Sequence, residues 1–334
     1  MIKNDYMIKD NLIIRVYTIG FDPQGESILI TICDGECVLF AGLIDCFIND
    51  NDYIINLLDK LNIKKLNYFC ITHPDFDHCV GVSKILDKIN CTTKVALPSR
   101  IFDFLNGYDL KVKESLESLR NLLNLRSNNK KKPILNTVCN NHTIIDDWNF
   151  YDHKGEKYEL NIMTITPSAN VIEKYALRNN TNEIDVEHND FSVVNLIKIG
   201  GLKLLLTGDT MNNAFKDAFA NLSKFGTEFF NSKIDFVKIP HHASPGSNLL
   251  LEKIKTNGYG IGISTTTVFR KSKLPNYELF IDYNSCSDYS FCTCTEKTSA
   301  EKKGIILYEA DITNMKNVVF LFDTAVEFNN YRSS

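Results

Sequence analysis

Three apolar segments of this chain each end in residues that can bind a metal ion. Residues 66–71 form the first segment, and residues 72–78 follow it with the sequence T-H-P-D-F-D-H. A β-branched and aromatic run, then a proline, then an apolar segment with helical spacing predict a strand, a tight loop and a helix. In open α/β sheets, ligand sites collect where strands end. Four side chains of this loop could bind a cation: His73, Asp75, Asp77 and His78.

The same arrangement recurs twice further along the chain. Residues 202–210 read L-K-L-L-L-T-G-D-T, an expected strand that ends beside an aspartate. Residues 234–247 read I-D-F-V-K-I-P-H-H-A-S-P-G-S, another expected strand that ends beside two histidines. Five of the chain's seven histidines lie at or next to these strand ends, namely His73, His78, His188, His241 and His242. Unrelated surface residues would not be distributed in this way, so we expect one shared site.

The order of these motifs resembles the metallo-β-lactamase superfamily. That superfamily has His-x-His-x-Asp-His, then a histidine, then an aspartate and a further histidine, each after an apolar strand. In this chain Asp75 replaces the second histidine of the first motif. The sequence H-P-D-x-D-H, followed by N-x-x-S-V-V, L-L-x-T-G-D and K-x-P-H-H-x-S, is similar to the hydrolase domain of ComEC-type DNA-uptake proteins and of related phosphorylcholine esterases. The resemblance runs from about residue 13 to about residue 322.

The resemblance implies a four-layer αβ/βα fold, in which two mixed β-sheets pack face to face with helices outside. A length of 334 residues is compatible with one domain. We therefore expect a single domain over residues 1–334, with a helical and basic insertion at about 100–150 and an irregular Cys-rich segment at about 283–303. Apolar residues at helical spacing predict an amphipathic helix over 110–125. The basic run at 127–132 is either a solvated turn or a contact for a polyanionic substrate.

The resemblance further implies two divalent metal ions, either zinc or manganese, with magnesium as an option. One ion would be held by His73, Asp75 and either His188 or Asn189. The other would be held by Asp77, His78 and one histidine of the 241–242 pair, and Asp209 would bridge the two ions. Because other members have P-G-H where this chain has P-H-H, the comparison favours His242 as the ligand. The carboxylate of Asp75 is a harder ligand than an imidazole, which favours manganese or magnesium at the first metal position.

Further roles are predicted around these ligands. We predict that Asp77 and His241 are catalytic, with His241 free to contact phosphate or to protonate the leaving group. Asp45 would orient a metal-bound histidine, and Ser244 and Lys238 would contact the substrate. Glu26, in the G-E-S stretch of an expected hairpin turn, is interpreted as a solvated residue, with an approach to the metals as the alternative.

One element of the ComEC-like pattern is absent. Those domains tend to have Tyr-Gly-His-Pro late in the chain, where this chain has S-K-L-P at residues 272–275. Leu274 therefore stands where a second proton donor would be. Either His241 suffices, or Arg270 or Lys271 substitutes electrostatically, or the substrate differs.

The predicted function is hydrolysis of phosphodiester bonds by a metal-bridging hydroxide, with DNA as the leading substrate and defence against foreign DNA as a hypothesis. One alternative is a small-molecule phosphodiesterase for a cyclic nucleotide or a phosphocholine-type ester. Another is a weakened hydrolase that acts as a regulatory or assembly subunit. The net charge of −4 and the isoelectric point of about 6.0 provide no overall basic field for a polyanion. A nucleic acid or nucleotide would therefore depend on local cations, and a protein partner or homo-oligomer stays open.

Composition also bears on location. We expect a cytoplasmic protein without a membrane contact, because no apolar run approaches the length of a bilayer span and the first ten residues are polar and charged. Most of the ten cysteines lie in apolar strand contexts, where a reduced thiol behaves as a small hydrophobic group. The C-x5-C-x-C spacing of Cys286, Cys292 and Cys294 lacks the C-x2-C pair of structural zinc sites, so metal binding there is disfavoured.

Overall fold

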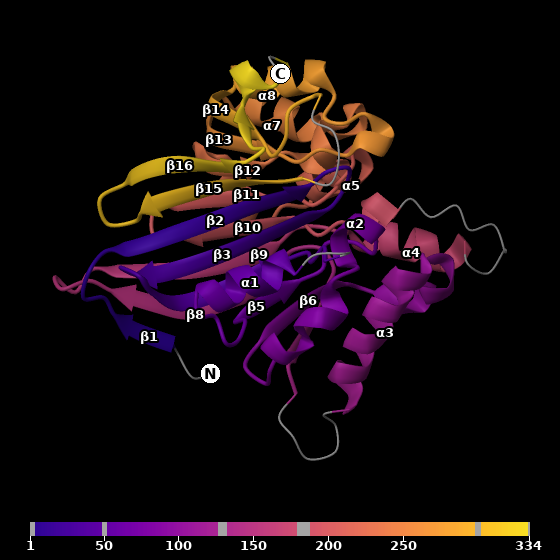
Figure 1. Cartoon of the computed structure of the whole chain (residues 1–334), viewed down its shortest axis with the longest axis horizontal. Helices are drawn as coiled ribbons and strands as arrows, with labels where there is room; N and C mark the ends of the chain where they lie inside the picture. Colours follow the sequence, from indigo (N-terminus) through magenta and orange to yellow (C-terminus); the bar gives the residue numbers. More distant parts are fainter. Residues whose placement is uncertain (1–3, 49–51, 126–131, 179–187, 298–301, 333–334) are drawn as a thin grey trace.

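Two mixed β-sheets packed face to face form the centre of the protein (Figure 1). The computed structural model describes residues 4–48, 52–125, 132–178, 188–297 and 302–332. In both sheets, antiparallel strands continue into parallel strands. Among the described residues no helix has the length and apolar character needed to cross a bilayer.

The first sheet has eight strands in the order β16-β15-β2-β3-β4-β5-β6-β7. Their bounds are β2 Leu12–Phe21, β3 Glu26–Asp34, β4 Cys37–Ile44, β5 Tyr68–Cys70, β6 Lys94–Pro98, β7 Ile134–Val138, β15 Lys303–Asp311 and β16 Lys316–Asp323. The strands from β16 to β4 pair antiparallel, and those from β4 to β7 pair parallel. The hairpin predicted near the N-terminus is confirmed as β2 and β3.

The second sheet has nine strands in the order β1-β8-β9-β10-β11-β12-β13-β14-β17. Their bounds are β1 Asn4–Met7, β8 His142–Tyr151, β9 Lys157–Thr164, β10 Asn195–Ile199, β11 Leu202–Leu206, β12 Ile234–Lys238, β13 Ile261–Thr266, β14 Ser287–Cys292 and β17 Val326–Glu327. The strands from β11 to β14 run parallel. Parallel pairing places the carboxyl ends of β11 and β12 side by side, which brings two of the predicted ligand motifs together.

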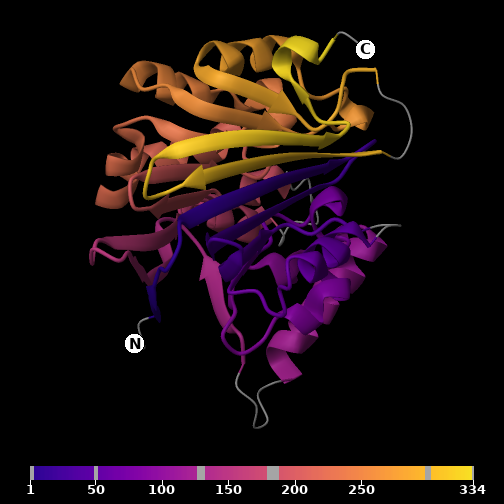
Figure 2. The same ribbon diagram turned by 60° about the vertical axis from the view of Figure 1, so that its left-hand side comes forward.

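Neighbouring residues of one strand pack in different layers. Tyr68 belongs to the core between the sheets, whereas Phe69 packs outward with residues of α1 and α3. This follows from the alternation of side chains along a strand. The opposite outer layer packs Phe215 of α5 and Phe280 of α8 against the other sheet. Figure 2 shows these two groups of helices on opposite sides of the strands. The predicted four-layer αβ/βα fold class is therefore confirmed.

The helices of these layers are short. The α-helices are α1 Tyr53–Lys60, α2 Phe76–Cys79, α3 Leu110–Leu125, α4 Ala169–Arg178, α5 Asn212–Ala220, α6 Lys224–Phe230, α7 Leu249–Asn257 and α8 Tyr277–Ser285. The 3-10 helices include η1 Val82–Lys88, η2 Ile101–Gly107, η4 His188–Phe191, η5 Pro240–Ala243, η6 Pro245–Ser247, η7 Arg270–Ser272 and η8 Phe328–Asn330. The amphipathic helix predicted over 110–125 is confirmed as α3, whose Leu116 and Leu119 are fully buried.

Two sequence expectations about local structure are wrong. The single helix expected at 80–89 is replaced by α2, which begins inside the ligand motif, and by the 3-10 helix η1. The segment expected to be irregular at 283–303 contains the end of α8 and the whole of β14. The serines of this segment do not predict a buried strand. In the structure Ser290 is nevertheless buried, and its hydroxyl lies 2.6 Å from the hydroxyl of Ser264 on β13, which satisfies both groups. Of the basic run at 127–132, residues 127–131 lie outside the described residues.

A buried hydrogen bond joins the two sheets. The phenol of Tyr68 on β5 donates to Asn195 Oδ1 on β10 at 2.5 Å, and both side chains are fully buried. Replacing Tyr68 by Phe keeps the ring but leaves the Asn195 oxygen without this donor. We expect Tyr68→Phe to lower the free energy of unfolding in urea by about 1–3 kcal/mol. The exposed Tyr259 is the control, and Tyr259→Phe should change it by less than about 0.5 kcal/mol. Equal losses in the two variants would contradict the role of the bond.

Candidate metal centre

The loop after β5 forms the first wall of the site. Asp75 has an extended backbone and precedes α2, so Asp77 and His78 lie in the first turn of that helix. His78 is fully buried and Asp77 is 6% exposed. The carbonyl of Asp75 accepts a hydrogen bond from the His78 amide at 3.1 Å, which fixes this turn. The short helix therefore directs two potential ligands inward rather than toward solvent.

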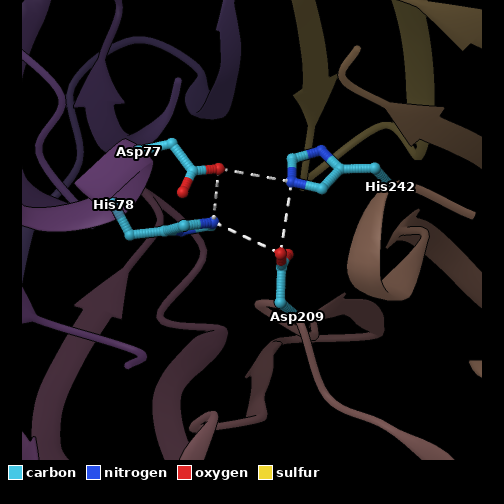
Figure 3. Close-up of side chains that lie close together, drawn as sticks. All are labelled: Asp77, His78, Asp209 and His242. Atoms are coloured by element: carbon cyan, nitrogen blue, oxygen red, sulfur yellow. Dashed lines mark ion pairs between the residues drawn. The ribbon is translucent and has the colours of Figure 1, made fainter. Parts of the chain in front are cut away.

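Three distant segments bring four potential ligands together. Asp77, His78, Asp209 and His242 each offer an atom within 4.8 Å of the others. Figure 3 shows the four side chains pointing toward one another. Asp209 Oδ2 lies 3.2 Å from His242 Nε2 and 3.5 Å from His78 Nε2. Asp77 Oδ2 lies 3.6 Å from His242 Nε2 and 3.5 Å from His78 Nε2. The sequence prediction that these side chains meet is therefore matched by their positions.

Unusual backbone conformations after β11 and β12 position the last two potential ligands, Asp209 and His242. Gly208 precedes Asp209 with φ +52°, and a Cβ on it would lie 2.8 Å from the Thr72 Cβ. His241 and His242 have φ values of 44° and 49°, in the left-handed region that most residues avoid. Strain of this kind persists where the surrounding structure imposes it, and it often accompanies functional sites.

Four atoms of this centre are buried without a hydrogen-bond partner among the described residues. They are His73 Nε2, His78 Nε2, His242 Nε2 and Asp77 Oδ2. A buried polar atom that lacks a partner costs about 1–3 kcal/mol, so a cluster of four such atoms is unfavourable. A divalent cation accepts lone pairs from imidazole nitrogens and carboxylate oxygens alike. The residues present therefore fit a metal ion.

Each of the three imidazoles is held through its Nδ1 atom. His78 Nδ1 lies 2.8 Å from Asp45 Oδ2. His73 Nδ1 lies 3.0 Å from the Thr72 hydroxyl, which itself donates to Asp45 Oδ2 at 2.7 Å. Because that hydroxyl has only one proton to give, it accepts from His73 Nδ1, and the Nε2 lone pair is left free.

His242 is held in the same way by different residues. Its Nδ1 lies 2.7 Å from the Thr267 hydroxyl, and that hydroxyl donates to Glu26 Oε2 at 2.5 Å. His78 and His242 thus turn Nε2 toward the centre, whereas His73 turns its Nε2 toward Asp75, 3.5 Å from Oδ2. Such outer contacts fix the tautomer and orientation of metal-binding histidines. Asp45 makes the contact that was predicted for it.

Lys238 and Glu26 complete a closed ring of contacts behind the centre. Lys238 Nζ lies 3.3 Å from Asp209 Oδ1 and 3.0 Å from Glu26 Oε1. Glu26 reaches His242 through Thr267, and His242 Nε2 returns to Asp209. Lys238 and Glu26 are both fully buried. Two sequence predictions are corrected here: Lys238 is enclosed and cannot contact a substrate, and Glu26 is not a solvated turn residue.

The charges of the centre perturb one another. Burial lowers the pKa of His242, but the carboxylates of Asp209 and Asp77 outweigh burial and raise that pKa to about 9. Burial also opposes the charge of His78, whose pKa is nevertheless held well above its usual value by the surrounding carboxylates, Asp209 foremost. Burial raises the pKa of Asp209, and His242, His78 and Lys238 outweigh it and lower that pKa. Metal-free protein therefore retains protons on His78 and His242 at neutral pH.

The other predicted metal position is only partly assembled. His73 Nε2 lies 3.5 Å from Asp75 Oδ2, and His188 Nδ1 lies 2.6 Å from Asp75 Oδ1. Asp75 therefore links the two histidines. Among the described residues, however, this trio does not form one close group with Asp209. Asn189, the alternative to His188, instead contacts His241, with its Nδ2 3.2 Å from His241 Nε2.

His241 lies at the rim of the centre. Its side chain is 20% exposed and its Nε2 is 4.0 Å from Asp209 Oδ2. The ring is fixed on its other side by Met211, whose sulfur is 2.7 Å from Nδ1. Burial lowers the pKa of His241 below its usual value. Ser244 ends the same turn and is half-buried, and its predicted contact with a substrate stays a prediction.

Arg270 does not replace the missing late histidine. Its Nε and Nη2 donate to the two carboxylate oxygens of Asp22 at 2.9 Å and 3.1 Å, and Nη2 also donates to the Thr295 carbonyl at 2.8 Å. Lys271 is exposed. The three late cysteines, Cys286, Cys292 and Cys294, are free thiols and do not form a metal-binding group within the described part of the chain.

Sequence reasoning missed two residues of the site. Thr72 lies inside the ligand loop and carries no signal of its own, and Thr267 ends a run of three threonines after an apolar strand. No local signal distinguishes Thr267, since its partner Glu26 is 241 residues away.

Comparisons with known proteins find distant structural likenesses. No family model and no curated protein matches the sequence. Among solved structures, a diphosphatase of the PhnP family has a TM-score of 0.37 and 11% identity, over 81% of this chain and 93% of that one. A metallo-β-lactamase from Staphylococcus aureus has a TM-score of 0.32 and 13% identity, over 73% of this chain and 50% of that one. Both likenesses are too distant to show what this chain does.

The first prediction from the site concerns charge compensation. Lys238→Met leaves the carboxylates of Glu26 and Asp209 buried without their ammonium partner. We expect the free energy of unfolding of the metal-free protein to fall by about 3–5 kcal/mol in urea titrations. Adding Glu26→Gln should restore part of this loss, because one unpaired charge is removed. Lys233→Met, which breaks an exposed pair with Asp288, should cost at most about 1 kcal/mol. A double variant as unstable as Lys238→Met would contradict the explanation.

The second prediction concerns metal binding itself. Titrating Mn²⁺ or Zn²⁺ into chelator-treated protein should raise the melting temperature and release protons at pH 7. The reason is that the histidines with raised pKa values, including His242 at about 9, must lose a proton to bind a cation. Affinity should therefore increase as the pH rises toward that value. Calorimetry in buffers of different ionisation enthalpy measures the protons released.

Matched variants separate this binding from adventitious metal uptake. Asp209→Asn should weaken the thermal shift, whereas His153→Asn, at an exposed turn, should not. A thermal shift of equal size in all three proteins would show that the metal binds elsewhere.

Proposed function

We propose that this protein is a metal-dependent hydrolase of phosphodiester bonds. The observation that supports the proposal most directly is the buried group of Asp77, His78, Asp209 and His242, with its unpaired nitrogen and oxygen atoms directed to one point. Phosphodiester cleavage requires charge neutralisation at the attacking and leaving oxygens, and clustered cations provide it. The order of the sequence motifs supports the same reaction class.

In this proposal two sets of residues hold divalent ions. Asp77, His78, His242 and Asp209 hold one, and His73, Asp75 and His188 contribute to a second. The bound ions supply Lewis acidity toward phosphate and water. Asp45, Thr72, Thr267 and Glu26 keep the histidine Nε2 atoms directed inward. Zinc and manganese are both suited to this mixed set of donors.

His241 is the proposed proton donor to the leaving oxygen. It is the histidine of the centre that combines partial exposure with a position beside Asp209. Met211 holds Nδ1 in place, and Nε2 would carry the transferred proton after its contact with the Asn189 amide is exchanged for one with the leaving oxygen. A lowered pKa makes a protonated imidazole a stronger acid, which suits proton transfer to an alkoxide.

DNA is the first candidate substrate, on the basis of the resemblance to ComEC-type domains. A small phosphodiester is the second candidate, and a specific observation favours it. Two cations that could have met a polyanion, Lys238 and Arg270, are both engaged by carboxylates inside the protein. The acidic isoelectric point of about 6.0 agrees with a substrate that carries few charges. The cytoplasmic location and the role in defence stay predictions.

The reaction class is tested with bis(p-nitrophenyl) phosphate and plasmid DNA in the presence of Mn²⁺ or Zn²⁺. Asp209→Asn should lower both metal content and kcat/KM, the latter by about two to three orders of magnitude. His241→Gln should lower kcat by about 100-fold or more at unchanged metal content, because it removes a proton donor and no ligand. His153→Gln is the control and should retain full activity. Wild-type protein that binds metal but is inert toward both substrates would overturn the proposal and favour a regulatory subunit.

Salt dependence separates the two candidate substrates. Binding of DNA releases counterions, so kcat/KM for DNA should fall steeply between 50 and 200 mM salt, by roughly 10³-fold or more if several phosphates are contacted. A small ester carries one charge and should lose little over the same range. Both substrates are assayed with the same enzyme preparation. If high salt removes the metal, kcat/KM falls equally for both substrates, whereas weaker DNA binding lowers kcat/KM for DNA alone.

A further inference from the structure

The two sheets have four edge strands, and three of these are short. β1, β7 and β17 contain 4, 5 and 2 residues. The fourth, β16, contains 8 residues and stands last in the strand order of its sheet, so no described strand pairs with its outer edge. Figure 1 shows β15 and β16 extending along the side of the molecule. Proteins often keep edge strands short, which prevents pairing with another chain. β16 is not short.

The residues of β16 are apolar and exposed. Val318, Phe320 and Phe322 alternate along one face and are 43%, 43% and 47% exposed. Leu321, on the other face, is 38% exposed. Scattered apolar residues are normal on a surface, but a continuous apolar strip marks an interaction site or an aggregation hazard.

Other protective features are also absent from this strand. Residues 317–322 read N-V-V-F-L-F, without a charge or a proline. The strand pairs with β15 over eight consecutive residues in one unbroken register, without a bulge. Charges, prolines and bulges are the usual means of blocking an exposed edge. Among the described residues, β16 therefore has no strand on its outer edge and could pair with a further strand.

We propose that β16 pairs with β16 of a second copy of this chain. The charged residues of the strand stand at its opposite ends, Lys316 first and Asp323 last. Antiparallel pairing of two copies brings each lysine to the aspartate end of the other strand, whereas parallel pairing would place like charges together. Asp323 already pairs with Lys303 of its own chain at 3.3 Å, and its side chain lies on the opposite face of the strand from Lys316. The charges at the strand ends therefore favour the antiparallel arrangement of two copies because it keeps like charges apart, and this is the arrangement that a two-fold axis produces.

The two-fold axis also matches the apolar strip to itself. An axis perpendicular to the sheet keeps the same side chains on the same face in both copies. Val318, Phe320 and Phe322 of the two copies then form one ladder of cross-strand pairs, and aromatic and β-branched pairs of this kind stabilise antiparallel strands. The unpaired backbone groups of each edge gain partners at the same time. Because each copy uses its one long edge, the assembly closes as a dimer.

This dimer is independent of the proposed hydrolysis. Four strands, β15, β2, β3 and β4, separate β16 from β5, which leads into the metal centre. Pairing at β16 therefore adds no residue to the centre and removes none. Metal content per chain should be the same in monomer and dimer.

The experiment measures the mass of the full-length protein by light scattering after size exclusion and by sedimentation equilibrium over a range of concentrations. The wild-type protein should be a dimer that dissociates on dilution. Phe320→Lys places two like charges near the two-fold axis and should raise the dissociation constant by about 100-fold or more. Phe320→Tyr, which keeps an aromatic ring, should remain dimeric. Tyr259→Lys, at an exposed apolar residue outside any strand, is the matched control and should also remain dimeric.

Circular dichroism and metal content confirm that each variant is folded. A wild-type protein that is monomeric at every concentration would overturn the proposal and leave β16 for a different protein. A dimer that survives Phe320→Lys would place the interface elsewhere and overturn it as well. Open-ended assemblies of increasing mass would contradict the closed two-fold pairing.

Discussion

Compensation of buried charge is the constraint on which the centre of this protein depends. Asp77 and Asp209 carry negative charge into a region that water hardly reaches. Two carboxylates so close together repel each other, and burial would protonate them without positive partners. Lys238 supplies one internal cation, and the histidines, or a metal ion in their place, supply the rest. The polar ring through Glu26 and Thr267 exists because each buried member needs a partner of opposite charge or a hydrogen bond.

The sandwich of two sheets allows residues from both halves of the chain to reach this region. The loop after β5 belongs to one sheet, whereas the loops after β11 and β12 belong to the other. Glu26 crosses from β3 to meet Lys238 of β12, so the ion pair lies between the layers. Rigid strands hold the backbone, and short loops with left-handed residues adjust the final direction of each ligand. A stiff scaffold with locally strained loops is well suited to fixed donor positions.

Several cationic side chains make internal contacts, which limits how this protein can attract a phosphate. Lys238, Lys203 and Arg270 are engaged by carboxylates or by backbone and side-chain oxygen atoms rather than directed to solvent. Attraction of a phosphate would then depend mainly on bound metal ions and on His241. In the proposed hydrolase, such a site would distinguish substrates by how they fit the metal centre and less by long-range attraction, because the net charge is weakly negative and exposed charges are screened by salt.

The strand-end motifs and the helix α3 could be predicted from the sequence, because periodicity is a local property. The grouping of Asp77, His78, Asp209 and His242 was implied by the resemblance in motif order. Packing of distant segments determines that Lys238 faces Glu26, that His188 contacts Asp75 while Asn189 contacts His241, and that β14 is a strand. In each of these cases the deciding partner is far away in the chain. The sequence around a lysine on a strand has the same pattern whether the side chain meets solvent or a buried carboxylate. The packing of the sheets determines which one it meets.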